Sequence, residues 1–333
     1  MTISFQSELV KQAVSEFKET PSLTLAKKLY KENSGLFISV EHVRRLVRYY
    51  RGADGKTSRK QTDRNYPQLA DESPRPYNPF QIPEAEQDKP ITWKLPHAYR
   101  RVLIMSDIHF PYHDVEAIEA AVLYAKERGV EAVFINGDLL DIYQASFHER
   151  DPRKMNIAEE LEMGRKFFQW LKEELNLPIY YIPGNHEARI ERYLKVKAPE
   201  LLGIPEFKLE FLLRCAEYGV TYIPFRSKCY IGKLLVEHGD KIPGAGGVNP
   251  ARTALLKFKR PVIVGHFHRT TQENSSVYDG DQQMAWSTGC LCTLEPDYMP
   301  LNNHNHGAAI IDVEHSTGHY RVENFVIING KVY

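Results

Sequence analysis

Short hydrophobic runs alternate with amphipathic stretches between residues 100 and 182, in the order strand, helix, strand. The apolar segments 102–105, 131–136 and 178–182 have the length and residue types of strands buried on both faces. Helical spacing of apolar residues predicts helices over 115–128 and 159–175. This alternation predicts a parallel sheet with right-handed crossover connections.

The second half of the chain carries the patterns of further strands rather than helices. They are predicted at 220–223, 229–231, 233–237, 261–264, 283–287, 307–313 and 320–328, and residues 91–93 predict a short edge strand. The turn at Gly232 joins two of them. We therefore expect two packed sheets with helices outside.

Residues 5 to about 51 show helical spacing instead, in three short segments. The first two are predicted at 5–18 and 24–33, and Ser39 is a suitable N-cap for the third. Seven prolines then fall among polar residues between Pro67 and Pro96, which predicts an extended spacer. The predicted domains are residues 1–52 (three helices), 53–97 (linker) and 98–333 (α/β).

The third helix is basic. Between Arg44 and Arg64 there are eight Lys or Arg residues against two Asp. Three helices with a basic last helix resemble helix-turn-helix DNA-binding modules. The candidate DNA-contacting residues are Arg44, Arg45, Arg48 and Arg51. The alternative is a protein-interaction domain with a solvated basic face, and no base-reading motif distinguishes the two.

Composition narrows the protein class without indicating a partner. The 333 residues include 43 Lys and Arg and 43 Asp and Glu, so net charge favours neither nucleic acid nor membrane. No apolar stretch has the length of a membrane span, and because the first residues have no apolar core, no secretion signal is expected. The four cysteines lack zinc-type spacing. We expect reduced thiols in a cytoplasmic protein.

Residue types that bind metal ions follow three consecutive predicted strands. Asp107 and His109 follow the first, Gly137-Asp138 the second, and Gly184-Asn185-His186-Glu187 the third. Because parallel strands present their carboxyl ends at one edge of the sheet, these side chains are expected to meet. Three such strand ends in succession indicate a metal site.

The chain resembles the calcineurin-like metallophosphoesterases once two further blocks are added. These are His238 and the segment Gly265-His266-Phe267-His268, which complete five blocks in the order of that family. The resemblance covers residue 98 to the C-terminus and leaves the N-terminal helices unexplained. It implies an α/β/β/α sandwich. The helical spacing of residues 5 to 51 adds a small all-α domain in front of it.

The resemblance also implies two metal ions and a ligand set for each. The first ion would take Asp107, His109, Asp138 and His268, and the second Asp138, Asn185, His238 and His266. Asp138 would bridge the two ions. Mn²⁺ is the expected metal. Fe and Zn²⁺ stay open as alternatives, because oxygen and imidazole ligands bind all three metals.

The implied reaction is hydrolysis of a phosphomonoester or phosphodiester by a metal-bridging hydroxide. His186 would give a proton to the leaving group, or otherwise serve only to support a ligand. Asp141 would orient a histidine or cap a helix. Candidate substrate contacts are His148, Arg150 and Arg189, with solvated surface as the alternative for the polar insertion that contains the first two.

We therefore expect a metallophosphoesterase that acts on a phosphate ester and is brought to DNA or to a protein partner by its N-terminal helices. The alternative is a non-catalytic scaffold that uses the same fold. Retention of a complete ligand set argues against a scaffold, which has no need of it.

Overall fold

The computed structural model describes residues 5–54, 81–83, 90–147, 150–244, 246–276, 282–296 and 301–333. The chain divides into two compact units, residues 1–86 and 87–333. Most of the predicted linker, and the candidate substrate residue His148, lie outside the described residues.

The N-terminal unit contains three helices around a small apolar core. They are α1 (Phe5–Glu16), α2 (Ser22–Glu32) and α3 (Val40–Tyr50). Val10, Leu25, Val43 and Val47 are fully buried between them. The Ser39 side chain accepts a hydrogen bond from the His42 backbone N–H at 3.1 Å, which caps α3 as predicted.

A seven-stranded sheet forms the larger half of the C-terminal unit. Its order is β13 (Lys331–Val332), β12 (His319–Ile328), β11 (His306–Glu314), β2 (Arg101–Met105), β3 (Ala132–Asn136), β4 (Ile179–Ile182) and β5 (Val220–Tyr222). Strands β2 to β5 pair in parallel, as the sequence predicts for β2, β3 and β4, whereas β5 was predicted among the strands of the second half. Strand β11 pairs antiparallel with β2, so the end of the chain extends the sheet.

A six-stranded sheet packs against the first. Its order is β1 (Thr92–Lys94), β6 (Lys228–Ile231), β7 (Leu234–Glu237), β8 (Val262–Val264), β10 (Gln282–Ser287) and β9 (Thr271–Ser276). The predicted edge strand is β1, which pairs in parallel with β6 and lies within the range predicted as linker. The predicted hairpin at Gly232 joins β6 and β7.

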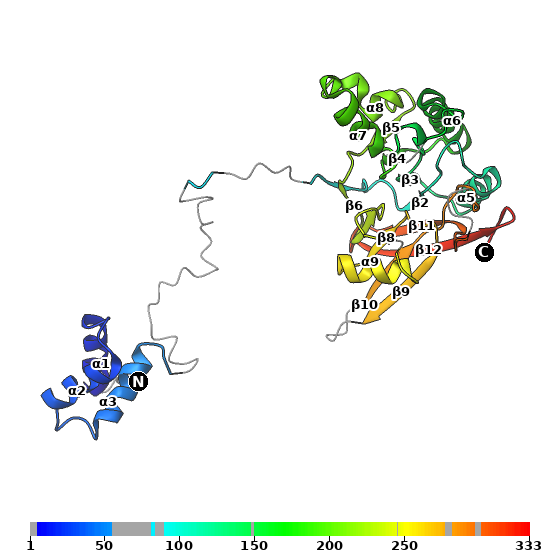
Figure 1. Ribbon diagram of the computed structural model, residues 1–333. Coiled ribbons are helices and arrows are strands. Elements are labelled where there is room, and N and C mark those ends of the chain that lie inside the picture. Colours follow the sequence, from blue (N-terminus) through cyan, green and yellow to red (C-terminus); the bar gives the residue numbers. More distant parts are fainter. Residues whose placement is uncertain are drawn as a thin grey trace. The chain divides into compact units, whose positions relative to one another are not determined.

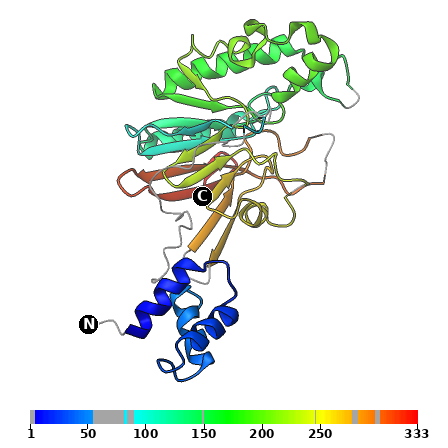
Figure 2. The ribbon, with the colours of Figure 1, turned by 90° about the vertical axis from the view of Figure 1, so that its left-hand side faces the viewer.

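Helices cover the outer face of each sheet and produce four layers (Figures 1 and 2). Helices α5 (Val115–Glu127), α6 (Ile157–Leu175), α7 (Ala188–Lys197) and α8 (Leu209–Leu212) pack on the seven-stranded sheet, and α9 (Pro250–Phe258) packs on the other. Side chains of β2 alternate accordingly, with Leu103 and Met105 under the helices and Val102 and Ile104 between the sheets. The α/β/β/α prediction is confirmed.

Two features of the strand arrangement differ from a simple division of the chain into halves. The late strands β11 and β12 return to the first sheet instead of joining the second. Strand β9 has the sequence TQENSS and was not predicted, because its residues are all polar and mostly exposed. Its antiparallel pairing with β10, and not burial of its side chains, holds this segment in the sheet.

Within the part of the chain that the structure describes, no helix combines the length and apolar character needed to cross a lipid bilayer.

Candidate metal centre

All the predicted metal ligands lie in loops that directly follow strands. The loops after β2, β3 and β4 come from the seven-stranded sheet, and the loops after β7 and β8 come from the six-stranded sheet. They carry Asp107, His109, Asp138, Asn185, His238, His266 and His268. The two sheets therefore bring the five sequence blocks to one edge of the sandwich.

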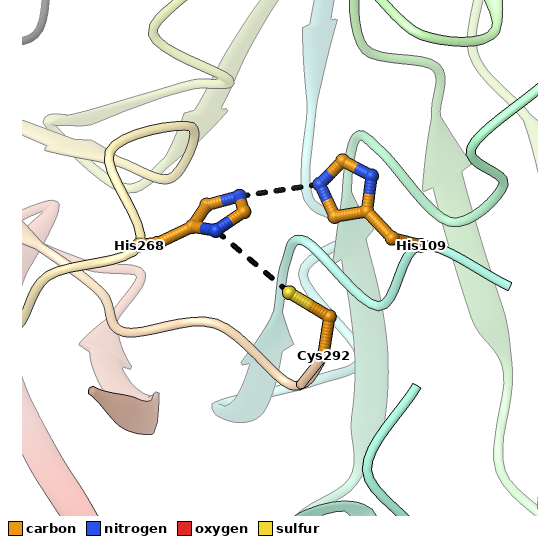
Figure 3. A group of neighbouring side chains, drawn as sticks. All are labelled: His109, His268 and Cys292. Atoms are coloured by element: carbon orange, nitrogen blue, oxygen red, sulfur yellow. Dashed lines mark hydrogen bonds between the residues drawn. The ribbon is translucent and has the colours of Figure 1, made fainter. Parts of the chain in front are cut away.

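Asp107, His109 and His268 form one side of the centre. His268 Nε2 lies 3.3 Å from Asp107 Oδ1 and 3.2 Å from His109 Nε2. Figure 3 shows the two imidazole rings turned toward each other from loops 159 residues apart in the chain. Their facing nitrogens and the free carboxylate oxygen converge on one point.

Asp138, His238 and His266 form the other side, with their ligand atoms all within 4.8 Å of one another. Asp138 Oδ2 lies 3.1 Å from His238 Nε2 and 3.7 Å from His109 Nε2. Asp138 is therefore the carboxylate that stands between the two histidine groups. This is the position that a bridging ligand requires.

Several buried polar atoms of the centre have no hydrogen-bond partner among the described residues. Asn185 Oδ1 is one, and so are Asp107 Oδ1 and His238 Nε2, whose contacts with His268 and Asp138 given above do not meet hydrogen-bond geometry. Buried polar atoms are normally paired, so unpaired ones that converge on a cluster call for an ion or ligand. Carboxylate, amide and imidazole donors fit a divalent cation.

The backbone is in an uncommon conformation at five of these residues. Asp107, His109, Asp138, His266 and His268 have φ values of 57°, 52°, 51°, 66° and 54°, in the left-handed region. Non-glycine residues adopt it rarely and at a cost of roughly 1–3 kcal/mol each. That five ligands share it indicates that the loops are shaped to aim these side chains.

Two glycines of the motifs allow the loops to come close enough. A Cβ on Gly184 would lie 2.2 Å from Asp138 Oδ1, and one on Gly265 would lie 2.7 Å from Asp107 Oδ2. Both distances are far below contact. Any side chain at these positions would displace a carboxylate of the centre.

The carboxylates and imidazoles strongly perturb one another's titration. Burial opposes charge on Asp107 and Asp138, but the neighbouring histidines outweigh it and hold both carboxyl pKa values well below normal. Burial likewise opposes protonation of His109 and His238, yet the carboxylates raise their pKa values to about 9 and about 10. A concentration of negative charge that attracts protons this strongly attracts cations too.

His186 lies beside the centre rather than among the facing ligands. Its Nδ1 is 3.0 Å from Asp141 Oδ1, and its Nε2 is 3.0 Å from an Arg189 guanidinium nitrogen and 3.9 Å from Asp138 Oδ2. Asp141 Oδ1 also lies 3.4 Å from His109 Nδ1. Asp141 thus orients two histidines, and it does not cap a helix.

Glu187 ties two of the loops together, a role that no sequence pattern indicated. Its buried carboxylate accepts backbone N–H groups of Asp138 at 3.1 Å, Leu140 at 2.9 Å and Gly184 at 2.7 Å. The loops after β3 and β4 are thereby held in register. The one sequence feature that could have pointed to Glu187 is its position directly after His186 in the motif.

Cys292 is a second residue that the sequence did not single out. Its sulfur lies 3.7 Å from His268 Nδ1, on the side of the ring away from His109 (Figure 3). A histidine that binds a cation through Nε2 carries its proton on Nδ1 and donates it to a neighbour. The Cys292 sulfur is placed to accept a hydrogen bond from Nδ1–H, and this contact helps to orient the His268 ring.

The candidate substrate residues are placed differently from one another. Arg189 lies at the centre, where its guanidinium also donates to the Asp141 carbonyl oxygen at 2.8 Å. Arg150 is exposed and donates to the Gln144 carbonyl oxygen at 2.6 Å, within its own loop.

Of the four predicted DNA-contacting arginines, two contact other residues of the N-terminal unit and two have exposed side chains. Arg51 donates to the Phe17 carbonyl oxygen at 2.7 Å and thus joins α3 to the end of α1. Arg44 pairs with Glu41 at 3.3 Å. Arg45 and Arg48 are exposed, one turn apart on α3.

Comparisons with known proteins identify the family. Residues 100–307 match the family model described as calcineurin-like phosphoesterase. The gene 54 protein of Mycobacterium phage L5 is 27% identical over 202 residues, which are 56% of this chain and 77% of that protein.

Solved structures show a looser likeness. A Vps29 mutant from Entamoeba histolytica is 12% identical, with a TM-score of 0.37, and the match covers 70% of this chain and 96% of that one. The E. coli phosphoesterase Yfce is 10% identical, with a TM-score of 0.31, and the match covers 67% and 98%. The assignment rests instead on the family match, which spans more than half of the sequence and includes all five blocks. The chain belongs to the calcineurin-like phosphoesterase family.

Proposed function

We propose that this protein hydrolyses phosphate esters with two divalent cations held at the candidate metal centre. Asp107, His109 and His268 would hold one cation, and Asn185, His238 and His266 the other, with Asp138 shared. The observation that carries the proposal is the position of Asp138 Oδ2, 3.7 Å from His109 Nε2 and 3.1 Å from His238 Nε2.

Two bound cations would lower the pKa of a water molecule and offset negative charge on the phosphoryl oxygens. Mn²⁺ is the proposed metal, with Fe and Zn²⁺ fitting the same donors. The residues of the chain supply the geometry. Glu187 and the left-handed backbone hold the ligands in place before any ion arrives.

His186 is the proposed proton donor to the leaving group. Asp141 accepts from its Nδ1, which leaves Nε2 as the atom that can deliver a proton. The Arg189 guanidinium lies 3.0 Å from that Nε2 and can only donate, so it must shift from the ring to the phosphate whose ester bond breaks before Nε2 can carry the proton. The arrangement favours catalysis over a scaffold role, because a scaffold needs neither an oriented histidine nor an adjacent guanidinium.

We also propose that the N-terminal helices direct the enzyme to DNA. Support comes from Arg45 and Arg48, which leave two positive charges exposed on one face of α3.

The test of the central proposal is metal content together with hydrolysis of bis(nitrophenyl) phosphate in Mn²⁺. The wild-type protein should bind two ions and hydrolyse the ester. Asp138→Asn should lose affinity at both sites and lower turnover at least about 100-fold, as expected for a main electrostatic contribution. Asp54→Asn, in the N-terminal unit, is the matched control. Two ions and near-normal turnover in Asp138→Asn would refute the assignment.

A further inference from the structure

A hollow of about 260 Å³ opens directly beside the candidate metal centre. Three residues of the centre line it, namely His109, Asp141 and His268. The remaining walls are made by Tyr112, Tyr143, Lys154, Cys292, Thr293, Glu295 and Pro296. Anything held there would lie against the point where the ester bond is cleaved.

One wall combines two aromatic rings with a positive charge. The Lys154 ammonium lies 5.4 Å from the centre of the Tyr112 ring and 4.9 Å from that of the Tyr143 ring. Tyr112 follows β2, whereas Tyr143 and Lys154 lie in the connection from β3 to α6, and all three are half-buried. At such distances a ring attracts a cation by roughly 0.5–2 kcal/mol, which helps to hold the ammonium at this wall.

The segment that carries Tyr143 is held firmly in place. Ile142, the preceding residue, is left-handed with φ of 50°, which is a genuine outlier for a β-branched residue. The buried Glu160 carboxylate accepts its backbone N–H at 2.6 Å. The Tyr143 hydroxyl in turn accepts the Asp151 backbone N–H at 3.1 Å. A wall that maintains such strain is suited to recognition rather than to filling space.

The chemistry of the walls defines the ligand. Tyrosine rings offer flat faces on which any nucleobase can stack. The ammonium offers a charge partner for a phosphate next to the one being cleaved. Glu295, which also lines the hollow, is an acceptor for amino groups and disfavours a second anion beside it.

We propose that this hollow binds one nucleotide of a single nucleic-acid strand, adjacent to the scissile phosphate. Tyr112 and Tyr143 would take the base, and Lys154 would take the neighbouring phosphate. The inference rests on the proposed phosphoesterase function and specifies its substrate class as a nucleotide phosphodiester.

Three chromogenic esters with the same leaving group separate the contributions. The first is methyl nitrophenyl phosphate, the second is the nitrophenyl ester of thymidine 5′-phosphate, and the third adds a 3′-phosphate to the second. The ratio of kcat/KM for the second to the first, called the base ratio below, reports the nucleoside, and its loss in a ring variant assigns the base. The ratio for the third to the second reports the extra phosphate, and each ratio cancels a general change in turnover.

Lys154→Met should lower the phosphate ratio by about tenfold or more, as expected for losing a charged hydrogen bond. Lys154→Arg should retain most of the ratio, and Lys257→Met on α9 should leave it unchanged. Tyr143→Leu should lower the base ratio by about 5- to 100-fold, whereas Tyr143→Phe keeps the ring and the ratio. Equal ratios in wild type and in both Lys154→Met and Tyr143→Leu would overturn the proposal.

A binding measurement keeps this outcome separate from failure of the proposed function. Calorimetry with the Mn²⁺-loaded protein should give tighter binding of thymidine 3′,5′-bisphosphate than of thymidine 5′-phosphate, and Lys154→Met should remove the difference. Absence of hydrolysis of all three esters by the wild type refutes the phosphoesterase function. Equal affinity for the two nucleotides refutes the nucleotide site, whether or not hydrolysis occurs.

Discussion

The candidate metal centre and the basic face of α3 hold their charges in opposite ways. In the centre, Asp107 and Asp138 are 0% and 1% exposed, and both pair with buried histidines. On α3, the Arg45 side chain is 82% exposed, and its ion pair with Asp54 is long, at 3.9 Å. One region keeps its charges out of water, and the other leaves them in it.

This difference determines how much each region reveals about function. Burying an ionised group costs several kcal/mol unless it is compensated, so a cluster of buried carboxylates and imidazoles with unpaired atoms persists only for a reason. An exposed arginine costs almost nothing and needs no reason. Burial and geometry therefore support the metal centre more strongly than charge alone supports the DNA-binding face.

The largest effect is expected from the histidine beside the buried cluster. His186→Ala should lower turnover by about 10²- to 10⁴-fold on alkyl phosphate esters, because their leaving group needs a proton. Nitrophenyl esters, whose leaving group is a weak base, should be nearly unaffected. Steady-state rates on the two ester types test whether His186 donates the proton, and the nitrophenyl esters serve as the internal control. A similar loss on both would assign His186 to holding the ligands instead.

A smaller effect is expected from Glu160, which is buried behind the centre. Burial is the largest influence on its carboxyl group and raises its pKa to about 7. Because the folded pKa exceeds the ordinary value of 4.5, the contribution of this group to stability is complete below pH 4.5 and is lost as pH rises through 7. The whole change amounts to about 3 kcal/mol.

Glu160→Gln keeps an acceptor for the Ile142 N–H and removes the titration. The free energy of unfolding of the variant should therefore fall less between pH 5 and pH 8 than that of the wild type. Urea unfolding at the two pH values measures the difference, with Glu159→Gln on the exposed side of α6 as the control. Parallel pH profiles for Glu160→Gln and the wild type would mean that the buried carboxyl does not couple to folding.

The smallest effect is expected on α3. If its exposed face contacts DNA, the full-length double variant Arg45→Glu, Arg48→Glu should bind duplex DNA more weakly. The slope of log affinity against log salt should become shallower by about 0.9 for each phosphate that the variant no longer neutralises. Fluorescence anisotropy at several salt concentrations gives both quantities, and Lys27→Glu, Lys31→Glu on α2 is a control of equal charge. Unchanged binding and slope would leave α3 as a surface for protein partners.

Much of the fold and the centre could be predicted because the relevant signals are local. Strand and helix periodicities located β2, β3, β4, α5 and α6 to within two residues at either end. Residues two apart after a strand identified Asp107 and His109. Each of these signals depends on the neighbours in the chain, so the sequence alone carries it.

The remaining features depend on residues that are distant in sequence. Nothing in the TQENSS segment predicts β9, because its strand character comes from pairing with β10. The contact of Cys292 with His268 and the hollow lined by Tyr112, Tyr143 and Lys154 arise where loops from different strands converge. The sequence determined which chemical groups are present and which strand ends carry them. Only the tertiary structure decided which groups face one another, because that depends on how two sheets pack and on the space left between their loops.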